Sequence, residues 1–143
     1  MAEVPASEQG SFAIEAAILV PSILLFLLLV IAAGRIETAG GVVDAAARDG
    51  ARSASLTRTA AAARHAARVT AATTLKQEGV SCRDQQVAQV DTDDFAPGIG
   101  QTGEVTVTVT CTVSLGDLSV PGLPGSKTMK SSFTSVVDAY RAR

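Results

Sequence analysis

The apolar run from Ser11 to Ala33 constrains this chain more than any other feature of its sequence. The run holds 23 residues dominated by Leu, Ile, Val, Phe and Ala, and Glu15 is its only charged residue. As an α-helix it would extend about 35 Å, enough to cross a hydrocarbon layer of about 30 Å. The sequence therefore predicts a transmembrane helix over residues 11–34, preceded by a short leader at residues 1–10.

Pro21 lies ten residues into this run. A proline inside a helix removes one backbone donor and clashes with the preceding turn, but neighbouring helices in a membrane can satisfy the freed carbonyl. We therefore expect a helix that continues through Pro21 with a kink between Ala17 and Pro21.

A cleavable secretory signal is the main alternative, since small residues at 30–34 end the apolar run. Signal peptides begin with a positively charged region and have an apolar core of about 7–15 residues. Here the leader contains no Lys or Arg, and the apolar core is longer than that range. Both observations favour a membrane anchor.

Glu15 raises the question of what a carboxylate does within a lipid-facing run. Insertion costs roughly 2.5–3.5 kcal/mol for such a charge at the bilayer centre and less near the interface. If a peptidase cut after Gly10, Ser11 would carry a new α-amine. In staggered parallel helices that amine could pair with Glu15 of a neighbouring subunit and set their register, a known use of buried charge. A carboxylate near the interface with no partner is the alternative.

Residues 35–78 are rich in alanine, the best helix former, and predict a stalk helix that continues from the membrane. Asp44 and Arg48 are spaced to form an i,i+4 ion pair. Small residues recur four apart, from Ala39 to Ser55, and such a face lets another backbone approach closely. This face could pack on the protein's own sheet or on neighbouring subunits, and we expect both.

Residues 79–143 predict a small β-rich head. Within residues 103–115, valines, Cys111 and Leu115 alternate strictly with threonines and Ser114, the pattern of a half-buried antiparallel strand. Residues 80–92 and 127–140 are weaker strand candidates. Because so few strands cannot bury an apolar face alone, the helix must cover them. The expected fold class is α+β, with a long N-terminal helix packed on an antiparallel sheet of three or four strands.

Cys82 and Cys111 are the only cysteines. If the head lies outside the cytoplasm they are expected to form a disulfide, which would contribute about 3–4 kcal/mol in the chain-entropy model. Two buried free thiols are the alternative.

No catalytic constellation is present in the sequence. His65 is the only histidine and stands among alanines and arginines, so we expect an exposed histidine without a catalytic role. Asp91, Asp93 and Asp94 are oxygen ligands that calcium could use, but the EF-hand pattern is missing and solvated loop acids are the expectation. With a net charge of −2 and few aromatics, no basic field favours nucleic acid. We expect neither an enzyme nor a bound cofactor or metal.

The segment "GSFAIE" followed by an apolar helix resembles a type IV prepilin cleavage site, in which Gly precedes the cut and Glu is fifth in the mature chain. More closely, residues 10–54 resemble the start of TadE-like proteins, minor pseudopilins of the tight-adherence (Flp) pilus machinery. Their pattern here is Glu15, Pro21, Gly34–Arg35 and "AARDGAR" at residues 46–52.

This resemblance implies cleavage between Gly10 and Ser11 by a prepilin peptidase, and subunit pairing through Glu15. It also implies a single-pass membrane protein with its head outside the cytoplasm, whose partners are pilins or pseudopilins of the same machinery. The pilus itself is the alternative location. The leader departs from the family pattern, since Glu3 and Glu8 stand where Lys or Arg is common. Orientation is therefore not determined by flanking charge.

The function expected from these features is structural: a non-enzymatic component of pilus assembly. The first alternative is a membrane-anchored binding module whose head recognises a surface ligand through its two Gly/Pro-rich loops, at residues 91–103 and 115–127. The second is a secreted domain that begins near Gly34.

Overall fold

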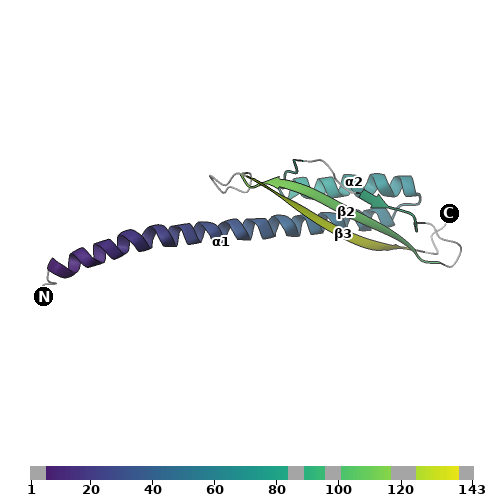
Figure 1. Ribbon diagram of the computed structural model, residues 1–143. Helices are drawn as coiled ribbons and strands as arrows, with labels where there is room; N and C mark the ends of the chain where they lie inside the picture. Colours follow the sequence, from purple (N-terminus) through teal and green to yellow (C-terminus); the bar gives the residue numbers. More distant parts are fainter. Residues whose placement is uncertain (1–5, 84–88, 96–100, 117–124, 139–143) are drawn as a thin grey trace.

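The computed structural model describes the backbone of residues 6–83, 89–95, 101–116 and 125–138. The elements follow the order α1 (Ala6–Ser55), α2 (Ala60–Gln77), β1 (Gln89–Asp91), β2 (Gly103–Ser114) and β3 (Ser126–Val137). The N-terminal half of α1 projects as a rod, and its C-terminal part is built into the head (Figure 1). The α+β fold class predicted from the sequence is confirmed.

The expected single stalk helix over residues 35–78 is wrong, because the chain turns back after Ser55 and forms two antiparallel helices. At the turn, both the backbone N–H and the hydroxyl of Thr57 donate to the carbonyl of Ala54. Thr59 then adopts an extended conformation and accepts a hydrogen bond from the Ala62 N–H, as a helix N-cap does. Alanine content alone gave no sign of this local turn.

The sheet is antiparallel with strand order β1-β2-β3. β2 and β3 pair over their whole length, from Gly103 opposite Val137 to Ser114 opposite Ser126. β1 pairs with β2 through Val90, which lies opposite Val107. Of the expected strand over residues 80–92, only β1 is seen at its end, and residues 84–88 lie outside the described part of the chain.

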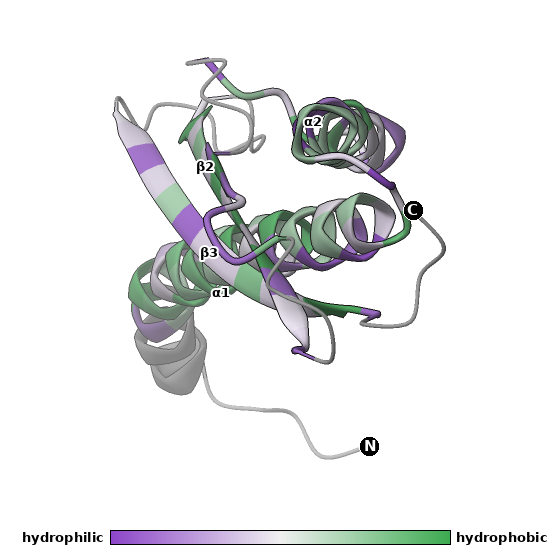
Figure 2. Cartoon of the chain, turned by 90° about the vertical axis from the view of Figure 1, so that its right-hand side faces the viewer, coloured by the Kyte–Doolittle hydropathy of each residue, from purple (hydrophilic) through white to green (hydrophobic). Residues whose placement is uncertain are grey.

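The core lies between one face of the sheet and the two helices, which are seen nearly end-on in Figure 2. The alternation of β2 is confirmed, because its valines and Cys111 are buried while its threonines face outward. From β3, Met129 and Val137 are buried on the same side and Phe133 is partly buried. Bulky side chains thus come from the sheet and small ones from the helices.

The small-residue face of α1 packs inside the head. Its members with less than 5 % of their surface exposed are Ala39, Val43, Ala46, Ala47, Ala51 and Ala54. At Gly50, a Cβ atom would lie 3.1 Å from the Ala67 carbonyl oxygen of α2 and 3.3 Å from Val107 Cγ1 of β2. The close approach predicted for this face is therefore made with the protein's own α2 and sheet.

Candidate functional site

The N-terminal half of α1 presents an apolar surface that no part of the head covers (Figure 1). Large aliphatic and aromatic side chains from Ile14 to Ile31 are about half or more exposed, with Leu25 at 71 %. Within the described residues, α1 is the one helix long and apolar enough to cross a membrane. Such a surface is stable in lipid and costly in water, which agrees with single-pass membrane anchoring.

Glu15 and Arg35 bracket the apolar part of this helix. The residues between them, 16–34, carry no charge, and the two positions are about 30 Å apart along a helix. This matches the thickness of the hydrocarbon layer. When Glu15 lies at one boundary of the hydrocarbon layer, Arg35 lies at the opposite boundary. Glu15 is exposed on α1, so in a bilayer its carboxylate reaches the interface rather than the costly centre.

Gly10 and Ser11, the predicted cleavage site, both fall within the helical backbone of α1. Pro21 also lies inside α1, and the helix continues on both sides of it. The Ser22 hydroxyl donates to the Ile18 carbonyl at 2.8 Å, a bond of the kind that often accompanies helix bending. The cleavage and the kink remain predictions.

The disulfide predicted between Cys82 and Cys111 is confirmed, with Cα atoms 5.1 Å apart. Cys111 is fully buried on the inner face of β2. Beside it, the Arg83 N–H donates to the Thr112 carbonyl at 2.8 Å. The covalent bond and the hydrogen bond together fix the segment after α2 to the middle of the sheet.

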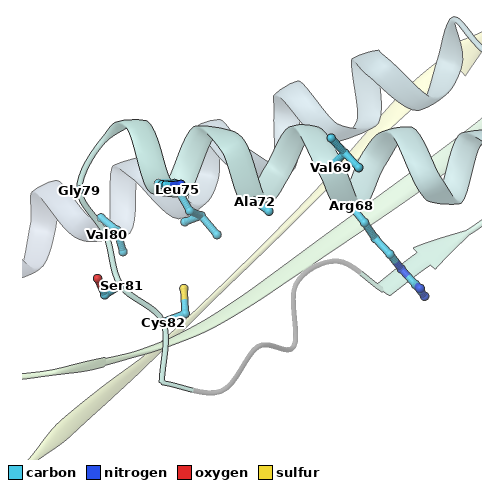
Figure 3. Close-up of a pocket in the computed structure, with 9 residues that line it drawn as sticks. Arg68, Val69, Ala72, Leu75, Gly79, Val80, Ser81 and Cys82 are labelled. Atoms are coloured by element: carbon cyan, nitrogen blue, oxygen red, sulfur yellow. The ribbon is translucent and has the colours of Figure 1, made fainter.

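A groove of about 510 Å³ lies between α2 and the segment from Gly79 to Cys82 (Figure 3). Val69, Ala72 and Leu75 contribute apolar surface to it. Among the described residues that line it there is neither a carboxylate nor a histidine, and Ser81 is its only hydroxyl side chain. Arg68 and Lys76 contribute its charged side chains.

The acidic loop is a turn rather than a cluster of ligands. The Asp91 carboxylate accepts a hydrogen bond from the Asp93 N–H at 3.0 Å, as in an Asx turn. In the part of the chain that the structure describes, no three His, Cys, Asp or Glu side chains come together closely enough to hold a metal ion. His65 is exposed on α2.

The sequence predicted only part of a polar contact between α1 and β3. The predicted Asp44–Arg48 ion pair forms at 2.9 Å. The other carboxylate oxygen of Asp44 accepts from the Ser131 hydroxyl at 2.8 Å. The Arg48 guanidinium lies over the Phe133 ring, 5.5 Å from its centre. Sequence spacing predicts the contact within the helix, but nothing in the sequence pairs α1 with these two residues of β3.

Comparison with known proteins gives one family. The model of the family described as TadE-like protein matches residues 10–52, from the predicted cleavage site through the membrane segment and into the head. No curated protein and no solved structure matches the chain. TadE-like proteins are structural and pilus-associated. The chain is therefore similar to TadE-like proteins over residues 10–52, which include Glu15, Pro21 and the buried small-residue face of α1 as far as Ala51.

Proposed function

We propose that this protein is a TadE-like minor pseudopilin, a structural component of tight-adherence pilus assembly that is processed after Gly10 by a prepilin peptidase. The observation that carries the proposal is the TadE-like match at residues 10–52, which falls on the exposed apolar helix with a carboxylate at its N-terminal boundary. The head is consistent with a structural role, because its described residues form a packed, disulfide-linked unit.

Glu15 is the residue that joins subunits in this proposal. Cleavage after Gly10 makes Ser11 the first residue of the mature chain and Glu15 the fifth. When one helix is staggered against the next, the amine of one subunit meets the Glu15 carboxylate of its neighbour. Removing one partner of a buried ion pair costs about 3–5 kcal/mol, a weakening on the order of a hundredfold or more.

The first experiment is intact-mass measurement and N-terminal peptide mapping of the protein purified from the membranes of its native host. A mature chain that starts at Ser11 supports prepilin-type processing. A chain that starts at Met1 or Ala2 contradicts it and leaves a plain membrane anchor, the binding-module alternative. A start near Gly34 would instead identify a secreted domain.

The second experiment compares Glu15→Gln with Glu37→Gln in cells. Both substitutions neutralise an exposed carboxylate on α1, but Glu37 lies beyond the apolar segment. Glu15→Gln is expected to lower the number of pili strongly at an unchanged amount of protein in the membrane, whereas Glu37→Gln should leave pili unaffected. Normal piliation in the Glu15→Gln strain would contradict the pairing.

A further inference from the structure

Two contacts fix how β3 runs along α1. Ser131 is hydrogen-bonded to Asp44, and Phe133 lies beneath Arg48. Residue numbers rise together in both elements, so β3 runs in the same direction as α1. The beginning of β3 therefore points back toward the membrane-spanning part of α1. Figure 1 shows β2 and β3 reaching back along the helix in this direction.

The position of Lys127 along the axis of α1 follows from the rise per residue of a strand and of a helix. Lys127 precedes Ser131 by four strand residues, which is about 13 Å. On α1, the same distance from Asp44 toward the N-terminus spans about nine residues and ends at Arg35. Lys127 is thus level with the residue that ends the uncharged membrane segment. Lys130 lies three residues further along the strand, about 10 Å higher.

Within β3, both charged side chains are lysines. Lys127 and Lys130 are both exposed, and Lys130 lies opposite Thr110 on the outer face of the sheet. Neither lysine forms an ion pair with another residue of the described ranges. On α1, Arg35 and Glu37 lie near this level, and both are exposed.

We propose that the beginning of β3 is a membrane-surface contact, where Lys127 and Lys130 bind the phosphate groups of anionic phospholipids. The proposal rests on α1 spanning the bilayer and is independent of pilus assembly. It holds the head against the bilayer at a second point besides α1, which limits the tilt of the head about the base of the helix.

Membrane dimensions decide which lysines take part. The headgroup layer is about 5–8 Å thick on each side of the hydrocarbon, and screening in physiological salt acts over about 8 Å. Lys127 lies within the headgroup layer, and Lys130 lies at its outer edge.

Lys76 of α2 serves as an internal reference. Thr74 is bonded to Asp49 in the antiparallel helix pair, so Lys76 is level with about residue 47 of α1, roughly 18 Å above Arg35.

The chain contains only these three lysines, so amine labelling of the whole protein tests the contact. The full chain is reconstituted in vesicles of zwitterionic lipid, or of the same lipid with anionic phosphatidylglycerol, and insertion is checked by carbonate extraction. Brief labelling with an amine-reactive ester, read by mass spectrometry, gives the rate at each lysine. In anionic vesicles the rate at Lys127 is expected to fall about three- to sevenfold, with a smaller fall at Lys130 and none at Lys76.

Salt and one substitution sharpen the test. At 1 M salt the screening length shrinks to about 3 Å, and the protection at Lys130 should disappear. Lys127→Glu should reduce the protection of Lys130 in anionic vesicles, while the control Lys76→Glu leaves it unchanged. If anionic lipid changes the labelling rate of all three lysines by the same factor, the proposal is overturned. Protection that is the same in both lipids would overturn the role of anionic headgroups.

Discussion

At the scale of single residues, the head depends on small side chains where α1 crosses its neighbours. Ala47 and Ala51 of α1 belong to one buried cluster with Ala67 and Ala71 of α2. Gly50 lies at the closest approach, where even a Cβ atom would meet the Ala67 carbonyl oxygen at 3.1 Å. Close packing of this kind tolerates little added volume.

Gly50→Leu is expected to destabilise the head by about 1–3 kcal/mol, because its side chain has no space between α2 and β2. Gly41→Leu is the matched control, since it makes the same change in the same helix where a Cβ meets no atom within 4 Å. The measurement is thermal unfolding in detergent followed by circular dichroism. Equal melting temperatures for the two variants would contradict the close approach at Gly50.

At the scale of secondary structure, β2 organises the head. Its inner side chains form the core, and its threonines pair with hydroxyls of β3, as Thr106 does with Thr134 at 2.7 Å. Cys111 of the same strand anchors the segment that leaves α2. The helix pair, the sheet and the segment after α2 are thus joined at one strand.

Loss of the disulfide is expected to lower the free energy of unfolding by about 3–4 kcal/mol, since it closes a loop of 29 residues in the unfolded chain. The variant Cys82→Ser/Cys111→Val keeps the inner face of β2 apolar while removing the bond. Its denaturant midpoint should fall to that of the reduced wild-type protein and should not respond to added reductant. An unchanged midpoint would show that the bond contributes no stability.

At the scale of the whole molecule, an apolar rod joins directly to a folded head. The core of the head begins at Ala39, one turn after the membrane segment ends at Arg35, so no long linker separates the bilayer from the head. A head attached in this way follows the tilt of α1, which suits a protein that packs its helix against others.

The proposed role in pilus assembly predicts a single orientation, with the head outside the cytoplasm. Protease added to intact spheroplasts should digest a C-terminal tag. The control is a cytoplasmic protein that is cleaved only after lysis. A protected C-terminal tag would reverse the orientation and contradict the pilus-assembly role.

Helices and strands were predictable from the sequence where one local pattern dominated. The apolar run required a membrane-length helix, and the strict alternation around Cys111 required a half-buried strand. The turn at residues 56–59 was not predictable from alanine content, because two hydroxyl side chains, those of Thr57 and Thr59, determine it through hydrogen bonds that helix propensity does not reveal. For the candidate site, the sequence identified Glu15, and the structure added its exposure on the uncovered part of α1.

The sequence by itself determined the membrane segment, the charges at its ends, the main strand and the availability of one cysteine pair, because each depends on hydropathy, period or residue identity along the chain. Only the tertiary structure decided that the small-residue face of α1 is buried under α2 rather than left for neighbouring subunits. It alone also brought Lys127 to the level of Arg35. Both outcomes depend on contacts between residues far apart in sequence, such as Asp44 with Ser131, and on the close fit that Gly50 permits.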